Sequence, residues 1–240
     1  MIDILGFARD VQSCRKFRAL TVKTIRTFAP LGVKRLSYHH VPPWGSEDRT
    51  NSLTVLSYGF PVTWLDRYKN RQYSTLDPVP RRALHLGKAF YWSEAANDPD
   101  ATAEERAYFA DVDTAAIGDG LAVPVFGPHG RNGYVGMGSG QAVRGFSPDT
   151  ELALQVMAQV AHLRFCALLA AEAGEPITLS SREHDVLVWM SQGKSNAVIA
   201  DILTVSPNTV DTYVRRIFKK LGVADRVTAS LRGMALGLLD

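Results

Sequence analysis

The chain has 240 residues, 46% apolar and 21% charged, so it can bury one large core or two modest ones. This composition excludes a disordered chain, and the net charge of +3 is too small to indicate a nucleic-acid partner by itself. Two cysteines give no disulfide framework. The N-terminus lacks the charge order of a signal peptide, and no uninterrupted apolar stretch approaches about 18 residues. We therefore expect a cytoplasmic protein without a membrane span.

The first part of the chain mixes helical and strand patterns. Apolar spacing predicts helices over residues 4–28, 62–71, 80–86, 102–116 and 150–172. Short segments rich in Val, Leu and Tyr, bounded by Gly or Pro, predict strands over 33–41, 53–58, 120–127 and 131–138. The turn GPHGRNG makes the last two strands a hairpin. The predicted fold class is α+β, an α-β-α sandwich around an antiparallel sheet.

A boundary follows the predicted helix 150–172. Gly174 and Pro176 in the segment EAGEPIT end a helix and suit a short connection. We predict a first domain over residues 1–171, a linker over 172–177 and a second domain over 178–240. Apolar residues on more than one side of helix 150–172 make it the best candidate for a dimer contact, although a core helix of the sandwich has the same pattern.

The second domain is all-α in pattern, with four predicted helices. Ser180 or Ser181 can cap the first, with Glu183 in the position of a capping box and Gly193 after its end. The second covers 195–203. The third begins at Ser206-Pro207 and closes at Gly222, and the fourth spans about 225–238.

The second and third of these helices, joined by a short turn, match a helix-turn-helix. On the third helix, Val210, Val214, Ile217 and Leu221 form an apolar stripe, and the opposite side is polar and basic. Residues 211–226 carry five basic and two acidic side chains, a net charge of +3 that suits phosphate contact. An ordinary amphipathic helix with a solvated face shows the same pattern, so both interpretations stay open on these residues alone.

The stretch from Leu179 to Ala229 resembles the LuxR-type helix-turn-helix. The matching residues are Arg182-Glu183, Val186-Leu187, Gly193-Lys194-Ser195, Ile199-Ala200, Leu203, Val205-Ser206, Thr209-Val210, Lys220-Leu221, Val223 and Arg226. The resemblance implies a DNA-binding domain whose third helix enters the major groove, with Asp211 and Arg215 toward the bases. The DNA-binding residues it implies are Lys194, Asn208, Thr209, Asp211, Thr212, Arg215, Arg216, Lys219 and Lys220. Asp211 departs from the basic or polar residue common there, and can bond to cytosine or point at a neighbouring Arg.

Residues 60–92 combine large rings with a carboxylate. Trp64 and Tyr68 share one side of a predicted helix, Asp77-Pro78 lies thirteen residues after Trp64, and Trp92 lies fifteen after Asp77. Rings supply contact area, an indole donates and a carboxylate accepts, which suits a pocket for a mostly apolar small molecule. A plain aromatic core with a surface Asp is the alternative.

This order and spacing resemble the autoinducer-binding domain of LuxR-family quorum-sensing receptors, with Gly120 and Pro124 fitting the same pattern. The resemblance implies an N-acyl-homoserine lactone as ligand. Trp64 would donate to the lactone carbonyl, Asp77 would accept from the amide N–H, and Trp92 would pack on the lactone ring. Tyr68 would lie along the acyl chain or bond to its carbonyl. The ligand-binding residues that we predict are Phe60, Trp64, Tyr68, Asp77, Val79, Trp92, Tyr38, Tyr73, Phe90, Tyr134 and Gly136.

Two departures from the family bear on the ligand. Phe60 stands where a Tyr is common, and Gly136 where a Ser or Thr is common, so hydrogen bonds near the acyl carbonyl are lost. With a ring-rich pocket, these losses favour a short, branched or aryl acyl group.

Enzymatic and metal sites are not predicted. His39 and His40 are adjacent on a predicted strand and point to opposite faces, so they cannot easily share a metal ion. A lactone-degrading enzyme or scavenger would need a nucleophile and a base in the pocket, and no Ser–His pair stands out. A phosphorylated receiver needs clustered acidic residues near the N-terminus to hold magnesium. We reject it because Asp3 and Asp10 are the only acidic residues among the first 40, in a segment with a helical pattern.

We therefore predict a ligand-dependent transcriptional regulator without a cofactor, acting as a homodimer on a near-palindromic operator. Its half-sites would lie roughly one DNA turn, about 34 Å, apart. RNA polymerase is a further candidate partner. An orphan regulator of this type, either independent of ligand or responsive to another small molecule, is the alternative.

Overall fold

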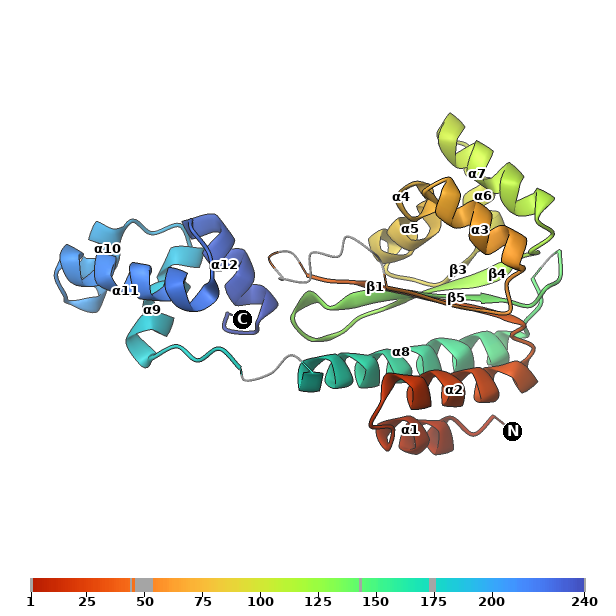
Figure 1. Ribbon diagram of the computed structural model, residues 1–240, viewed down its shortest axis with the longest axis horizontal. Coiled ribbons are helices and arrows are strands. Elements are labelled where there is room, and N and C mark those ends of the chain that lie inside the picture. The colour runs from red at the N-terminus through yellow and green to blue at the C-terminus, as the bar shows by residue number, and fades with distance from the viewer. Residues whose placement is uncertain (1, 44, 46–53, 143, 173–175, 240) are drawn as a thin grey trace. The chain divides into compact units, whose positions relative to one another are not determined.

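The computed structural model describes residues 2–43, 45, 54–142, 144–172 and 176–239 (Figure 1). The chain divides into two compact units. The first unit takes in most of the chain up to Glu172. The second takes in Ala173–Asp240 with two short loop stretches, Pro42–Arg49 and Pro128–Arg131.

An antiparallel sheet forms the middle of the first unit (Figure 1). Among the described residues it has five strands in the order β2-β1-β5-β4-β3. Their bounds are β1 Arg35–Val41, β2 Thr54–Tyr58, β3 Phe90–Tyr91, β4 Gly120–Val125 and β5 Asn132–Gly138. Four of them occupy the predicted strand segments. Strand β3 was not predicted, because two residues are too few to show an alternating pattern.

Helices cover both faces of the sheet, which confirms the predicted sandwich (Figure 1). On one face lie α1 (Ile4–Gln12), α2 (Phe17–Phe28), the short 3₁₀ helix η1 (Ala29–Leu31) and α8 (Pro148–Glu172). The prediction of one helix over 4–28 was wrong. The first helix ends at Gln12, and the extended Lys16, with φ −139° and ψ 145°, precedes the start of the second at Phe17.

The other face carries α3 (Val62–Asn70), α4 (Tyr73–Leu76), α5 (Pro78–Leu86), α6 (Trp92–Ala96) and α7 (Ala103–Thr114). Because successive strand residues point to opposite faces, the sheet separates two cores. Leu36, Val135 and Met137 point into the core with α1, α2 and α8. Ala122 and Tyr134 point into the aromatic core under α3 to α7.

Helix α8 is the one helix among the described residues that is long and apolar enough to cross a membrane, by length and composition alone. Leu154, Met157 and Leu168 are buried in the sheet core, which is typical of the core helix of a folded domain. Apolar side chains also lie exposed on α8, namely Leu152, Val156 and Leu163. The helix therefore has one apolar side in the core and another at the surface.

The second unit contains four α-helices within residues 176–239: α9 (Ser181–Ser191), α10 (Asn196–Leu203), α11 (Pro207–Leu221) and α12 (Arg226–Ala235). A short 3₁₀ helix, η2 (Pro128–Gly130), lies in the β4–β5 loop. Ser180 and Ser206 cap two of these helices, as their sequence positions predict, and Asp225 caps a third. Val186, Ile199, Ile217 and other apolar residues of all four helices share one core.

Candidate functional site

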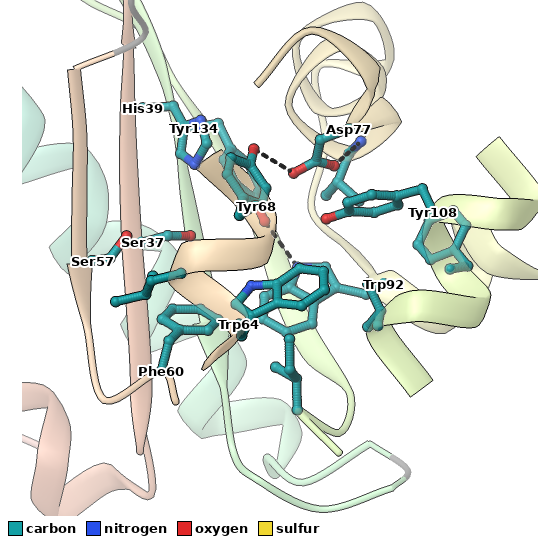
Figure 2. Close-up of a pocket in the computed structure, with 15 residues that line it drawn as sticks. Ser37, His39, Ser57, Phe60, Trp64, Tyr68, Asp77, Trp92, Tyr108 and Tyr134 are labelled. Carbon is teal, nitrogen blue, oxygen red and sulfur yellow. Dashed lines mark hydrogen bonds between the residues drawn. The ribbon is translucent and has the colours of Figure 1, made fainter. Parts of the chain in front are cut away.

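A pocket lies on the sheet face that carries α3, α5 and α7 (Figure 2). Strands β1, β2 and β5 supply one wall, and the helices supply the others. It is lined by Ser37, His39, Ser57, Phe60, Trp64, Leu65, Tyr68, Asp77, Val79, Trp92, Tyr108, Phe109, Val112, Ile117 and Tyr134. The lining combines rings with a few polar groups, as in sites for small organic molecules.

The floor of the pocket is a row of small residues across the sheet. Ser57 pairs with Ser37, Ser37 pairs with Gly136, and Gly136 pairs with Ala122. Cross-strand partners lie side by side on the same face of an antiparallel sheet. Ser57 and Ser37 of this row line the pocket, whereas the Tyr134 hydroxyl covers Gly136.

Asp77 is the acidic group of the pocket, placed by the start of α5. It is the N-cap residue, and its Oδ1 accepts from the Val79 backbone N–H at 2.9 Å. Its Oδ2 accepts from the Tyr68 hydroxyl at 3.1 Å, and the Tyr108 hydroxyl bonds to the same carboxyl group. Burial raises the pKa of Asp77 to about 6, and these hydrogen bonds only partly oppose the rise. Above that pH the pocket holds a carboxylate surrounded by donors.

The two tyrosines beside Asp77 remain neutral hydroxyls. Burial raises the pKa of Tyr68 and of Tyr108 far above the ordinary value, and the neighbouring Asp77 charge raises both further. A neutral hydroxyl can donate one hydrogen bond and accept another. Tyr68 and Tyr108 can therefore support Asp77 and still accept a hydrogen bond from a bound molecule.

Two contacts hold Trp92 against the sheet. Its indole Nε1 donates to the Tyr134 hydroxyl at 2.9 Å (Figure 2). Its six-membered ring lies over Gly120, where a Cβ atom would come within 2.6 Å of it. Because only glycine fits at position 120, the backbone of β4 sets the place of the indole. The Tyr134 hydroxyl in turn lies over Gly136, where a Cβ atom would come within 2.5 Å of it.

The pocket brings together seven of the eleven residues predicted to bind ligand: Phe60, Trp64, Tyr68, Asp77, Val79, Trp92 and Tyr134. Tyr73 lies behind Trp64, with ring centroids 6.0 Å apart, and its hydroxyl donates to Asp111 at 2.5 Å. Phe90 is buried in the same aromatic core without lining the pocket. Gly136 lies in the floor, covered by the Tyr134 hydroxyl.

Tyr38 does not point into this pocket, which corrects its predicted place. Its neighbours Ser37 and His39 face the pocket, so alternation along β1 turns Tyr38 to the opposite face. There its hydroxyl bonds to Nδ1 of His162 on α8 at 2.8 Å. The ring packs against Phe165 of the same helix, with centroids 4.9 Å apart.

Eight lining residues were not predicted. The polar ones are Ser37, His39, Ser57 and Tyr108, and the apolar ones are Leu65, Phe109, Val112 and Ile117. The alternation of side chains along β1 could have indicated Ser37 and His39, since His39 and His40 point to opposite faces of the sheet. His39 lines the pocket, whereas His40 lies near Phe165, with ring centroids 5.3 Å apart. The described residues contain no group of His, Cys, Asp or Glu that could hold a metal ion.

We expect Gly136→Ala to weaken ligand binding about tenfold while leaving the protein folded. The new Cβ would lie 2.5 Å from both Ser37 Oγ and the Tyr134 hydroxyl, so Tyr134 must move and release Trp92. The readout is the dissociation constant of the small molecule that binds the parent chain most tightly. Gly138→Ala is the matched control two residues along β5, because its Cβ meets no atom closer than 3.3 Å. Equal affinities for the two variants would contradict this assignment.

The second unit presents a polar helix side. Along α11, Val210, Ile217 and Leu221 are buried, as the apolar stripe predicts, and Val214 is partly buried. The exposed side chains of the predicted DNA-binding set are Lys194, Asn208, Thr212, Arg215, Arg216, Lys219 and Lys220. Thr209 is partly buried, and its hydroxyl bonds to the capping Ser206 at 2.8 Å. Because most of this set is exposed and basic, the face suits a phosphate backbone.

Asp211 is half-buried, and a hydrogen bond within the second unit engages one of its carboxylate oxygens. Its contact with a base stays a prediction. Its Oδ1 accepts from the Asn196 side-chain amide on α10 at 2.5 Å. Asn196 accepts in turn from Arg226 of α12 at 2.9 Å, and Arg226 also donates to the Lys194 carbonyl. These bonds tie α10, α11 and α12 together behind the exposed face.

Lys220, which was predicted to contact the DNA backbone, makes two hydrogen bonds within the second unit. Its ammonium donates to Glu183 Oε2 at 2.7 Å and to the Thr178 carbonyl at 3.1 Å. Glu183 is 3% exposed and closes the capping box of α9 with Ser180. Burial alone would raise the pKa of Glu183, but the bonds from Lys220 and Ser180 outweigh it and lower that pKa.

We expect Lys220→Ala to lower the free energy of unfolding of the second unit by about 1–2 kcal/mol, because it strands a buried carboxylate. The half-exposed ammonium keeps the loss below that of a fully buried pair. Lys219→Ala is the matched control, since the exposed Lys219 makes no ion pair among the described residues. Chemical denaturation measures both variants. Equal stability would show that Lys220 does not serve the cap.

Comparison with known proteins gives two family matches. Residues 22–165 match the autoinducer binding domain, and residues 177–232 match the bacterial regulatory proteins of the luxR family. The chain is 28% identical over 185 residues to the quorum sensing-dependent transcriptional regulator RpaR of Rhodopseudomonas palustris, covering 77% of this chain and 75% of that protein. It is 28% identical over 193 residues to the putative regulator y4qH of Sinorhizobium fredii, covering 80% of this chain but 58% of that protein.

Solved structures show the same fold. The crystal structure of Escherichia coli SdiA superimposes with a TM-score of 0.75 at 20% identity, covering 98% of this chain and 99% of that one. SdiA in complex with octanoyl-rac-glycerol gives a TM-score of 0.73 at 19% identity, covering 97% and 93%.

The family matches confirm both resemblances seen in the sequence. The autoinducer-binding match alone spans more than half of the chain, and the helix-turn-helix match covers most of the second unit. Relatives with both parts are transcriptional regulators and not enzymes. The chain belongs to the LuxR family of quorum-sensing transcriptional regulators, with an autoinducer-binding domain followed by a DNA-binding helix-turn-helix domain.

Proposed function

We propose that the protein senses an N-acyl-homoserine lactone in the pocket beside Asp77 and regulates transcription in response. The observation that carries this proposal is the buried Asp77 carboxylate, flanked by Tyr68 and Tyr108 and facing an apolar, ring-lined space. The three donors to Asp77 do not fully offset the cost of burying its charge, because its pKa stays raised. The amide N–H of an acyl-homoserine lactone can supply a further hydrogen bond to this carboxylate. The lactone ring would lie against Trp92, with Trp64 donating to its carbonyl.

The proposal includes a cytoplasmic homodimer on a near-palindromic operator. Residues 1–171 would bind ligand and dimerise, 172–177 would link, and 178–240 would bind DNA. The exposed apolar side of α8, with Leu152, Val156 and Leu163, supports it as the dimer contact, because exposed apolar patches mark interaction sites. No cofactor is needed, and RNA polymerase would be met at the operator.

The test is the soluble yield and melting temperature of the full chain, expressed with and without a panel of ligands. The panel contains lactones with short, branched and aryl acyl groups, and octanoyl-glycerol as an acyl compound without a lactone. A rise in both readouts with one lactone supports the proposal, since a ligand that binds the folded state stabilises it by mass action. No response to any lactone, from a stable dimer that binds DNA, would overturn the sensor and favour a ligand-independent regulator. A response to octanoyl-glycerol alone would overturn the proposal that the ligand is a lactone.

A further inference from the structure

His39 is a polar side chain that lines the pocket and takes no part in the hydrogen bonds around Asp77 and Trp92. The residue is 3% exposed, and its ring meets the Tyr134 ring edge-on, with centroids 5.3 Å apart. Its Nδ1 atom is buried and has no hydrogen-bond partner among the described residues. A buried nitrogen without a partner costs free energy, and structures retain such atoms where a ligand or a water completes them.

The strand pairing places His39 within a polar wall. His39 lies beside Tyr134 in the β1–β5 register, and Ser37, two residues earlier on the same face, lies beside Ser57 of β2. Figure 2 shows His39, Ser37 and Ser57 on one side of the pocket, with Asp77 and Tyr108 across from them. A molecule held at Asp77 therefore faces a second set of polar groups where an unsubstituted acyl chain offers only carbon.

The chemistry of this wall selects an uncharged partner. Burial lowers the pKa of His39 to about 4, so the imidazole is neutral at physiological pH and offers one donor and one acceptor nitrogen. Among the described residues that line the pocket there is no Lys or Arg to pair with an anionic substituent. A hydroxyl group suits it best, since a hydroxyl can donate to one ring nitrogen or accept from the other.

We propose that His39 is a specificity-determining residue that hydrogen-bonds a hydroxyl group on the acyl part of the ligand, with Ser37 and Ser57 completing the polar wall. The inference rests on the lactone-binding function proposed above and names the class of acyl group. Sites built to bond a substrate hydroxyl discriminate strongly against the analogue that lacks it, because their polar groups are left unpaired.

The experiment measures dissociation constants of the full chain for two matched pairs of homoserine lactones. One pair carries butanoyl and 3-hydroxybutanoyl groups, and the other carries cinnamoyl and 4-hydroxycinnamoyl groups. We expect the hydroxylated member of one pair to bind about tenfold or more tightly than its partner. His39→Leu should bring that ratio to within about twofold, and His39→Gln, which keeps a donor and an acceptor, should restore part of it. His40→Leu is the matched control, because it makes the same change on the opposite face of β1 and should leave the ratio unchanged.

If the parent chain binds both members of each pair equally, the inference about His39 is wrong, but the proposed lactone-binding function stands. The same conclusion follows if His39→Leu leaves the ratio of the two dissociation constants unchanged. Failure of all four lactones to bind overturns the proposed function and this inference with it. Should His39→Leu not fold, the nitrogen resonances of His39 in the parent chain decide the matter. They should shift with the hydroxylated member and not with its partner, and equal shifts count against the inference.

Discussion

Replacing Asp77 with Asn should make the unliganded protein more stable at pH 8 and remove most of its response to lactone. The native pKa of Asp77 is raised to about 6 from an ordinary value near 3.8, so between these values the folded state binds more protons than the unfolded state. Stability then falls as the pH rises through that window, by about 3 kcal/mol in total. Asn removes this loss and caps the helix about as well as Asp does.

The same substitution removes the charged acceptor for the ligand's amide N–H. Hydrogen bonds to charged groups are worth about 1.5–3 kcal/mol, so ligand affinity should fall roughly 10- to 100-fold. Melting curves of parent and variant from pH 4 to 8, with and without lactone, measure both effects. Asp225→Asn is a matched control, because Asp225 caps α12 through the same kind of bond and its pKa is lowered.

The outcome that would contradict this account is an Asp77→Asn chain that melts below its parent at pH 8 and still gains full stability from lactone. Asp77 would then act as a helix cap only. If the variant is instead more stable than its parent without lactone and does not respond to lactone, then the Asp77 carboxylate serves ligand binding and lowers the stability of the unliganded protein.

The sequence predicted those parts of the fold that are long and periodic. The sandwich, most strands and the helices of the DNA-binding domain follow from apolar spacing and capping residues such as Ser180 and Asp225. Strand β3 and helix α6 are too short to show a period, although together they place Trp92. The break between α1 and α2 covers residues 13–16, and the apolar spacing on either side of it continues without a visible interruption.

The sequence predicted those site residues that lie close together along the chain. It missed those whose place in the pocket depends on contacts between distant segments. Trp64, Tyr68 and Asp77 lie close along the chain, and all three line the pocket. Tyr38 was predicted to line the pocket because it is aromatic. Only the pairing of β1 in the sheet shows which alternate residues of the strand point toward α3 and α5. The same limit applies to Asp211, whose orientation depends on Asn196 of another helix.

We expect Arg215→Ala to reduce affinity for the operator at least tenfold and to leave lactone binding unchanged. Arg215 is exposed on α11, one turn after Asp211, and neither an ion pair nor a side-chain hydrogen bond engages it among the described residues. Asp211, Asn196 and Arg226 hold the helix from within the unit, so Arg215 is free to reach a base edge. A bidentate Arg–guanine contact contributes about 1–3 kcal/mol of discrimination.

The measurement is fluorescence anisotropy with an operator selected from random duplexes by the parent chain, alongside a scrambled duplex. Loss on the operator without loss on the scrambled DNA identifies a base contact, whereas Lys219→Ala should weaken both and lower the salt dependence by about one counterion. Arg182→Ala is the control for net charge, since it removes one exposed arginine from α9 instead of α11. If Arg215→Ala bound the operator as the parent does, the recognition face would have to be sought on another side of α11. If it weakened both duplexes equally, Arg215 would be a phosphate contact, and sequence would be read by neighbours such as Asn208, Thr212 and Arg216.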